Sequence, residues 1–320
     1  MRVLVTGASG FAGSHLCEHL LAQGDEVYAL CFSGCSTENL LGIQEHIEVL
    51  SGDLLDREWT ARAVAEVRPE AVYHLAGLAS PSASFADPAG TLANNILAQV
   101  HLFQAILKAG LDPVVLVIGS SEEYGMVRPE EVPIDEDTPL RPANPYGVSK
   151  VAQDFLALQY FISHRLRTVR VRPFNHIGPR QALGFVTADF AHQVASIEAG
   201  RQPPVIRVGN LEARRDFTDV RDMVRAYALA VALGEPGEVY NIGSDKGHAI
   251  GEILDILLSL SRVQVRVEAD PARMRSVDIP LLVCDSRRFR QRTGWQPRIP
   301  LEQTLRDTLD YWRERVGVPR

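Results

Sequence analysis

Long apolar runs, an excess of basic charge and paired cysteines are all missing from this sequence. No apolar run reaches the roughly 18–20 residues that a bilayer-spanning helix needs. The opening residues, MRVLVTG, include no long apolar core of the kind found in a signal peptide. The formal net charge of −7 gives no overall basic field that would attract nucleic acid or a membrane surface. These absences predict a cytoplasmic enzyme or binding protein with no nucleic-acid or membrane partner.

Cysteine is also scarce, at four of 320 residues. Cys17, Cys31, Cys35 and Cys284 form no Cys-x-x-Cys pair, and no second cluster completes a zinc site with Cys31 and Cys35. We therefore expect no metal, and free thiols in a reducing compartment. The hydrophobic content of 46% with 23% charged residues is ordinary for a globular protein. The length suits one large α/β domain or two lobes.

Short β-branched runs alternate with longer amphipathic stretches. The runs cover residues 3–7, 26–30, 47–53, 71–77, 114–120, 168–174 and 238–244. The helical patterns over 14–24 and 94–110 each end at a glycine, which is a common helix stop. Continuous apolar strands are typical of a parallel sheet covered on both faces. The alternation therefore predicts an α/β fold with a Rossmann-type doubly wound sheet.

The regular alternation fades near residue 175, where the Pro- and Gly-rich segment FNHIGPRQALG lies. We expect two lobes between which the chain crosses back and forth. Residues 1–174, with about 216–244, are expected to form a nucleotide-binding domain. Residues from about 175–215 and 245–320 are expected to form a smaller C-terminal α/β substrate domain.

Directly after the first predicted strand comes GASGFAG, in which Gly7, Gly10 and Gly13 have the spacing GxxGxxG. Glycine lets the backbone turn tightly and approach a pyrophosphate at a helix N-terminus. The order of strand, glycine turn and helix therefore predicts a dinucleotide site. A plain turn between a strand and a helix is the alternative interpretation.

The end of the second predicted strand has neither the acid that favours NAD nor the arginine that favours NADP. It reads ALCFSGCS over residues 29–36, and the hydroxyls of Ser33 and Ser36 suit either cofactor. We therefore expect NADP(H) or NAD(H). Asp53 ends the third predicted strand, where it could bond an adenine edge or, as its structural alternative, cap a helix.

The stretch NPYGVSK places Tyr146 and Lys150 four residues apart, on one face of a helix. An ammonium beside a phenol favours the phenolate, which lowers the tyrosine pKa from about 10 toward neutral pH. Tyr146 is then a candidate general acid or base for interconverting an alcohol and a ketone. A solvated helix face is the usual alternative for YxxxK. The order of motifs favours catalysis, because the glycine turn and GSSEEYG (119–125) precede YxxxK.

These motifs resemble those of the extended short-chain dehydrogenases/reductases that act on nucleotide sugars. The matching stretches are TGASGFAG (6–13), HLAG (74–77), DPAGTLANNI (87–96), GSSEEYG, PYGVSK (145–150), RPFNHIGP (172–179), RRDFTDVRD (214–222) and YNIGS (240–244). The resemblance implies a Rossmann domain with a smaller substrate domain. It also implies a catalytic triad of Ser120, Tyr146 and Lys150.

The resemblance also implies the cofactor contacts and the assembly. The implied cofactor residues are Gly7, Gly10, Phe11, Gly13, Asp53, Leu54, Leu75, Ala76, Tyr146 and Lys150. Asn95 matches an asparagine on the first helix of the family's subunit interface. Helices near 94–109 and 147–163 are therefore expected to form a four-helix bundle between two copies in a homodimer. Burial in the core is the alternative for their apolar faces.

The substrate half resembles the GDP-mannose branch of this family in FNHIGPRQALGFVTADFA, VGNLEARRDFTDVRD and RMRSVDIP. The implied contacts to a GDP-sugar are Ser121, Asn175, Val186, Asn210, Arg215 and Arg275. The two arginines are candidates for the diphosphate, which a guanidinium binds through paired hydrogen bonds. Their structural alternative is an ion pair, for example of Arg215 with Asp216 or Asp219. His176 receives no catalytic role.

Two activities of this branch compete. Glu122 falls where GDP-mannose 4,6-dehydratases have an acid/base glutamate, which favours elimination of water. Ser120, CFSGCSTENL and IGPRQALG depart from the dehydratase pattern, and GSSEEYG, FNHIGP and GFVT resemble the reductase pattern. We expect a reductase that uses NAD(P)H to convert GDP-4-keto-6-deoxy-D-mannose to GDP-D-rhamnose, with Tyr146 as the general acid. The alternatives are the dehydratase, a related GDP-sugar 4-reductase or epimerase, and a non-catalytic NAD(P)-sensing protein.

Overall fold

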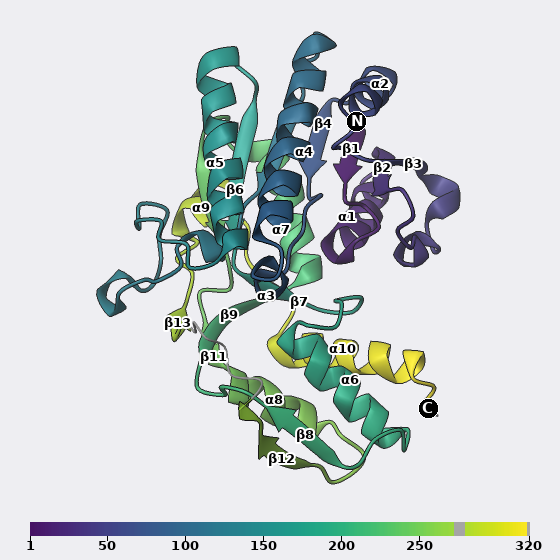
Figure 1. Cartoon of the computed structure of the whole chain (residues 1–320), viewed down its shortest axis with the longest axis vertical. Helices are drawn as coiled ribbons and strands as arrows, with labels where there is room; N and C mark the ends of the chain where they lie inside the picture. The colour runs from purple at the N-terminus through teal and green to yellow at the C-terminus, as the bar shows by residue number, and fades with distance from the viewer. Residues whose placement is uncertain (272–278, 319–320) are drawn as a thin grey trace.

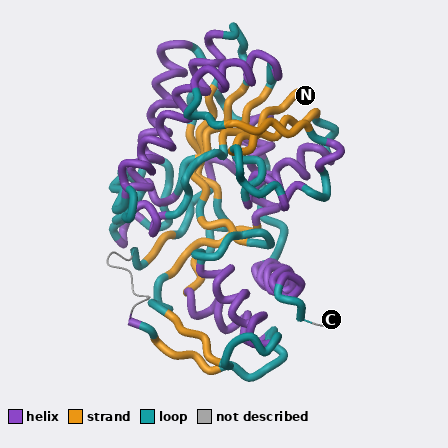
Figure 2. The backbone as a smooth tube through the Cα atoms, turned by 45° about the vertical axis from the view of Figure 1, so that its right-hand side comes forward, coloured by secondary structure: helices purple, strands orange, loops and turns teal. Residues whose placement is uncertain are grey.

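Figure 1 shows a computed structural model of the chain, which describes residues 1–271 and 279–318. A larger part, at the top of the view, is a sheet between two layers of helices. A smaller part below it carries the C-terminus. In Figure 2 the strands of the large sheet run side by side through the upper part, and a short ribbon of two strands lies at the lower end.

The larger part is built on a seven-stranded sheet in which every pairing is parallel. From edge to edge its strands are β10 (Val239–Ile242), β6 (Thr168–Pro173), β5 (Val114–Ile118), β4 (Ala71–His74), β1 (Arg2–Thr6), β2 (Glu26–Phe32) and β3 (Glu48–Gly52). Each of the seven expected strands overlaps one of these, and the predicted Rossmann-type α/β fold is confirmed. The strand order reverses between β1 and β4, which is the place where such sheets open a crevice at their carboxyl ends.

Helices cover both faces of this sheet, as parallel crossovers require. The helices are α1 (Phe11–Ala22), α7 (Val220–Leu233) and α9 (Arg287–Thr293) on one face, and α2 (Arg57–Val67), α4 (Pro88–Lys108) and α5 (Pro145–His164) on the other. Successive side chains of a strand point to opposite faces. Leu4 therefore lies in the core beside α4, whereas Val5 lies in the core beside α1.

Short helical turns lie in the loops of the larger part. They are α3 (Pro81–Ser84) and the 3-10 turns η1 (Glu38–Leu40), η2 (Gln44–His46), η3 (Ser121–Glu123) and η4 (Pro129–Glu131). Within residues 1–271 and 279–318, no helix is both long and apolar enough to cross a bilayer.

The smaller part has its own core. Its elements are β7 (Asn175–Ile177), β9 (Arg214–Asp219), β11 (Gly247–Ala249) and β13 (Leu281–Leu282) in one sheet, β8 (Val205–Val208) and β12 (Arg266–Ala269) in a two-stranded sheet, and helices α6 (Val186–Glu198), α8 (Ile250–Ser259) and α10 (Leu301–Arg315). Phe190, Leu254 and Leu305 bring the three helices together in this core. The three helices cover one face of each sheet, and the apolar side chains buried between them stabilise the smaller part.

Two segments pack in a different part of the molecule from the one expected from the sequence. Strand β9 pairs with strands of the smaller part, although residues 216–244 were expected with the nucleotide-binding domain. Phe289 and Trp295, from the expected substrate domain, are buried in the core of the larger part. The Trp295 indole also donates a hydrogen bond to the carbonyl of Asp222 on α7 (3.1 Å). The chain therefore crosses between the parts more often than the sequence pattern indicates.

The carboxylate of Asp216 joins β9 to the loop that follows β10. It accepts hydrogen bonds from the backbone N–H groups of Ser244 (2.8 Å), Asp245 (2.8 Å) and Cys284 (3.2 Å), and from the Ser244 hydroxyl (2.6 Å). Ligand atoms of Asp216, Asp245 and Cys284 lie within 4.8 Å of one another. Since these hydrogen bonds use both oxygens of Asp216, we assign the cluster a structural role.

Candidate active site

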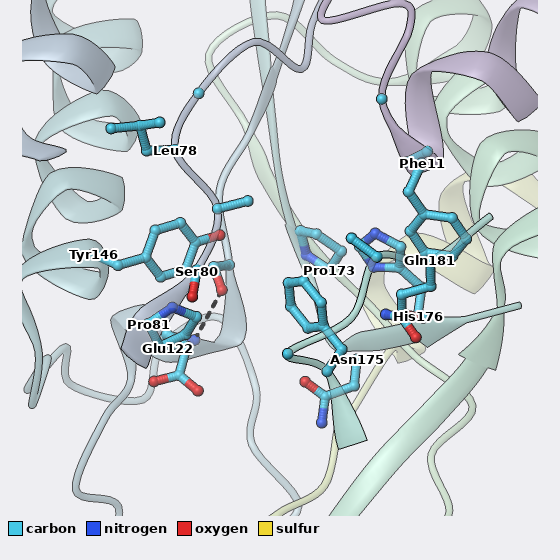
Figure 3. A pocket seen from close by; sticks show the side chains of 18 of the residues that line it. Phe11, Leu78, Ser80, Pro81, Glu122, Tyr146, Pro173, Asn175, His176 and Gln181 are labelled. Carbon is cyan, nitrogen blue, oxygen red and sulfur yellow. Dashed lines mark hydrogen bonds between the residues drawn. The ribbon is translucent and has the colours of Figure 1, made fainter. Parts of the chain in front are cut away.

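A cavity of about 760 Å³ opens between the carboxyl ends of the parallel strands and the smaller part. Every site residue expected from sequence that lies within residues 1–271 or 279–318 lines it. They are Gly7, Gly10, Phe11, Gly13, Asp53, Leu54, Leu75, Ala76, Ser120, Ser121, Glu122, Tyr146, Lys150, Asn175, Val186, Asn210 and Arg215. Arg275 lies outside the described residues. Figure 3 shows Tyr146 and Glu122 on one wall, facing Asn175 and His176 on the other.

The glycine turn between β1 and α1 is shaped for close approach of a ligand. Gly7 has a φ of +69°, and a Cβ at this position would lie 2.9 Å from the backbone nitrogen of Ala76. A Cβ on Gly13 would lie only 2.2 Å from the carbonyl oxygen of Gly7. Gly10 precedes α1 and provides no side-chain cap. The helix N-terminus therefore faces the cavity with its N–H groups, which fits a dinucleotide pyrophosphate.

Asp53 lines the same cavity beyond the glycine turn. Its side chain accepts the N–H of Leu55 (2.8 Å), whereas the cap of α2 is Asp56, which accepts the N–H groups of Glu58 and Trp59. The helix-cap alternative for Asp53 was therefore wrong. Because Asp53 lines the cavity, its contact with the adenine edge stays a proposal.

The three residues expected as the triad come from two neighbouring elements. Ser120 follows β5 with an extended backbone, and Tyr146 and Lys150 lie in the first turns of α5. The Lys150 ammonium donates to the carbonyl of Ile118 (2.8 Å) and lies 5.9 Å from the centroid of the Tyr146 ring. Ser84 of α3 accepts the backbone N–H of Tyr146 (3.2 Å). The three side chains expected as the triad thus meet at one end of the cavity.

The protonation of Tyr146 differs from the sequence expectation. Burial raises the pKa of its phenol, the hydrogen bond with Ser120 lowers it, and the carboxylates of Glu122 and Glu123 raise it further. The expected lowering by Lys150 was wrong for the structure as it stands, because desolvation outweighs any favourable charge. Burial also lowers the pKa of Lys150 to about 8. At neutral pH the site therefore holds a protonated phenol beside a mostly protonated ammonium.

Glu122 is held in the cavity by a residue that the sequence analysis did not single out. Asn144 donates through Nδ2 to Glu122 Oε2 (2.7 Å) and accepts the N–H of Gly147 through Oδ1 (2.7 Å). Asn144 is the N-cap of α5, so the residue that starts the helix of Tyr146 and Lys150 also aims the Glu122 carboxylate. The pair Asn144–Pro145 was a readable signal, since asparagine before proline often begins a helix.

Asn95 lies on α4, a helix expected at the subunit interface, and its side chain points into the interior of its own chain. Its side chain is fully buried and donates to the hydroxyl of Ser149 (2.8 Å). It also accepts the N–H of Leu78 (2.8 Å) and donates to the carbonyl of the same residue (3.2 Å). Asn95 therefore fixes the loop after β4 against α5, and this loop borders the cavity.

The opposite wall of the cavity comes from the smaller part. Arg215 is buried there and donates to the carbonyl of Arg214 (2.9 Å). Asp219, one of its two expected ion-pair partners, is instead paired with Arg221. The ring of His176 stacks on Phe11 of the glycine turn, with centroids 5.8 Å apart and planes 7° apart. This contact joins the wall from the smaller part to the glycine turn of the larger part.

The family model described as GDP-mannose 4,6 dehydratase matches residues 4–308 of the chain. The chain belongs to this family of extended short-chain dehydrogenases/reductases. The resemblance inferred from GSSEEYG, PYGVSK and the glycine turn is thereby confirmed. The fold and the layout of the cavity agree with that membership.

Individual relatives cover the full length of the chain. The GDP-6-deoxy-D-mannose reductase of Pseudomonas aeruginosa is 37% identical over 315 residues, with 98% of each chain covered. The structure of RMD from the same organism, complexed with NADPH, gives a TM-score of 0.86 at 34% identity and covers 98% of this chain and 100% of that one. The UDP-glucose 4-epimerase of Thermus thermophilus, complexed with NAD, gives a TM-score of 0.88 at 32% identity, with 98% and 99% covered.

Replacing Gly13 with alanine is expected to weaken dinucleotide binding, because the new Cβ would collide with the Gly7 carbonyl oxygen 2.2 Å away. We expect a loss of affinity of about tenfold or more, the factor that corresponds to roughly 1.4 kcal/mol. Fluorescence titration with NADPH and NADH measures it. Gly42→Ala is the control, since no heavy atom lies within 4 Å of its Cβ position. Unchanged affinity of Gly13→Ala would contradict the assignment of this turn.

Proposed function

We propose that this protein reduces the C4 keto group of GDP-4-keto-6-deoxy-D-mannose with NAD(P)H to give GDP-D-rhamnose, with Tyr146 as the general acid. The observation that carries the proposal is that Ser120, Tyr146 and Lys150 line one cavity together with the glycine turn after β1. The Tyr146 phenol is protonated at neutral pH, because the ordinary tyrosine pKa of about 10 is raised further by burial, so it can give its proton to an oxygen that gains charge. The 37% identity to a GDP-6-deoxy-D-mannose reductase over nearly the whole chain supports the same reaction class.

The cofactor proposed for the cavity is NADPH or NADH, because one relative is complexed with NADPH and another with NAD. A bound NAD(P)H supplies the hydride for C4. Gly7, Gly10 and Gly13 would hold its pyrophosphate at the start of α1. Asp53 would reach the adenine, and Lys150 would lie at the opposite, reactive end of the nucleotide.

The protein's own part in the reduction is to place and move one proton. Tyr146 gives its hydroxyl proton to the sugar oxygen O4 as negative charge develops there. Ser120 orients O4 from the other side, and the Lys150 ammonium stabilises the phenolate left on Tyr146. Lys150 suits this task because its pKa, lowered by burial to about 8, leaves it charged at neutral pH.

The GDP-sugar would lie along the wall that the smaller part provides. Asn175 and Arg215 are proposed for the diphosphate, since a guanidinium matches the geometry of phosphate oxygens. Val186, at the first residue of α6, and Asn210 are proposed for the guanosine end. Ser121 is proposed to contact the sugar.

The dehydratase remains the second candidate, and the position of Glu122 is the observation that favours it. Its carboxylate lines the cavity near Tyr146 and is held there by Asn144. A carboxylate in this place could remove a proton from the sugar and assist loss of water. In the reductase we propose that Glu122 instead binds a sugar hydroxyl.

We also propose that the protein is a homodimer formed by α4 and α5. Val148, Phe155 and Ile162 are spaced by seven residues, so they form one stripe along α5. They are 44%, 52% and 61% exposed, and Leu97 on the adjoining α4 is 44% exposed. A second copy related by a two-fold axis would cover this stripe in a four-helix bundle.

A cytoplasmic location is the remaining proposal. It rests on the thiols: all four cysteines are free, and three of them are buried. Unpaired cysteines are typical of proteins in a reducing compartment.

Product analysis tests the proposed reaction directly. The purified protein is incubated with GDP-mannose alone, and separately with GDP-4-keto-6-deoxy-D-mannose plus NADPH or NADH. We expect reduced cofactor to be consumed only with the keto sugar, and NMR to identify GDP-D-rhamnose. Tyr146→Phe is expected to bind NADPH normally without turnover, because it keeps the ring and loses the proton. Conversion of GDP-mannose without added reductant would reject the reductase.

Glu122→Gln separates the two candidate activities. Glutamine keeps the size of the side chain and an oxygen that can accept from Asn144, so keto reduction should remain largely intact. A dehydratase would lose about 10²–10⁴-fold in kcat, which is the usual contribution of an acid–base group. Glu131→Gln, in a carboxylate–Arg141 ion pair outside the cavity, is the matched control. Complete loss of activity in Glu122→Gln would point to elimination chemistry.

Substituting glutamate for both Phe155 and Ile162 should produce a monomer, because four charges would be buried at the two-fold interface. Sedimentation velocity measures the change in mass. Val263→Glu in the smaller part, where the valine is 41% exposed, serves as the control and should leave the dimer intact. A double variant that sediments like the unmodified protein would place the interface elsewhere.

A further inference from the structure

Glu123 lies beneath the catalytic turn, where the proposed mechanism does not use it. Glu122 lines the cavity, whereas its neighbour Glu123 is fully buried in the protein interior. A buried carboxylate is costly unless charges and hydrogen bonds stabilise it. The groups that contact the Glu123 carboxylate therefore indicate its role.

One oxygen of Glu123 holds the turn that carries Ser120. Oε1 accepts the backbone N–H of Ser120 (2.8 Å), while the Ser120 hydroxyl accepts the N–H of Glu122 (3.2 Å). These reciprocal bonds form a capping box at the start of η3. The box fixes the backbone of Ser120 and thereby the direction of its hydroxyl.

The other oxygen of Glu123 belongs to a buried network of charges. Oε2 lies 3.1 Å from Nε of Arg172, and the same Nε donates to Asp154 (2.9 Å). Asp154 also pairs with Arg170, which lies on β6 as Arg172 does. Two carboxyl groups and two guanidinium groups therefore alternate behind the cavity. Burial and the negative charge of Asp154 raise the pKa of Glu123 to about 8, while Arg172 lowers it, so Glu123 carries its full negative charge only at alkaline pH.

Glu123 and Lys150 clamp the same end of β5. Lys150 binds the carbonyl of Ile118, and Glu123 binds the N–H of Ser120, two residues further along the chain. Gly119 lies between them, and a Cβ there would lie 2.2 Å from Glu123 Oε1. The glycine of GSSEEYG therefore admits the carboxylate directly under the strand end.

The charged and titratable groups around Glu123 come from four elements. They are Glu122 and Tyr124 beside it, Tyr146, Lys150 and Asp154 on α5, Arg170 and Arg172 on β6, and, next to Lys150, His74 on β4. Burial lowers the pKa of His74 to about 3, which leaves it neutral. Burial lowers the pKa of Lys150, and the negative charge of Glu123 acts against that lowering.

We propose that Glu123 is a positioning residue for the reaction. Its carboxyl group holds the Ser120 turn and, at alkaline pH, helps to keep the Lys150 ammonium charged, without touching cofactor or substrate. The effect on turnover rests on the proposed function, whereas the effect on the Lys150 end of the cofactor site can be measured without any sugar.

Two substitutions separate these two tasks. Glu123→Gln keeps an acceptor for the Ser120 N–H and removes the negative charge. Lys150 should then lose its proton at lower pH, so the pH above which NADPH binding weakens should move toward neutrality. Glu123→Asp keeps the charge but withdraws it from Ser120. The kcat of Glu123→Asp should fall about tenfold, as for a lost buried hydrogen bond. The pH above which its NADPH binding weakens, here called the alkaline limb, should stay unchanged.

Fluorescence titration with NADPH from pH 6 to 10, a range of about four units around the lowered Lys150 pKa of about 8, gives the limb without a sugar. The control is Glu198→Gln, which removes a buried carboxylate paired with Arg313 at the far end of α6. It should lower thermal stability without moving the limb or kcat.

An unmoved limb in folded Glu123→Gln, together with an unchanged kcat in Glu123→Asp, would overturn the proposal. If the glutamine variant does not fold, unchanged kcat in the aspartate variant overturns it alone. Failure of the wild-type protein to reduce GDP-4-keto-6-deoxy-D-mannose would count against the proposed function instead. A shifted limb in the Glu198→Gln control would show that generic loss of stability explains the effect, and would also overturn the proposal.

Discussion

Removal of polar groups from water at the carboxyl edge of the parallel sheet is the constraint on which the rest of this structure depends. Lys150 reaches that edge and bonds the carbonyl that ends β5. Arg172 lies behind it with acids on both sides. Each buried charge requires a partner, and each partner fixes a backbone segment. The chemistry and the rigidity of the cavity therefore arise from the same hydrogen bonds.

Much of the fold and the membership of the site could be predicted from the sequence. Continuous apolar runs located the seven strands, and the order of motifs brought Ser120, Tyr146 and Lys150 together. The protonation of Tyr146 could not be predicted, because it depends on how much of the cavity wall covers the phenol once distant segments have packed. Asn144 was missed for a related reason: its side chain has two roles, and only the helix cap has a sequence signature.

Adjacent glutamates show the same limit of sequence reasoning. Glu122 and Glu123 follow one another on a 3-10 turn, so their side chains leave in different directions. The first reaches the cavity, and the second enters a network whose other members lie on α5 and β6. Nothing local to GSSEEYG distinguishes them, since the guanidinium that pairs with Glu123 comes from Arg172, far along the chain. Long-range contacts decided which acid is buried.

The burial of Trp295 has a consequence for how the protein is made. Its indole completes the core between the sheet and α7, although 294 residues precede it in the chain. Domains that fold during synthesis usually do so once their own segment has emerged from the ribosome. Here the larger part of the molecule stays incomplete until almost the entire polypeptide has been translated. A premature stop near the C-terminus would therefore damage the half of the molecule that is encoded first.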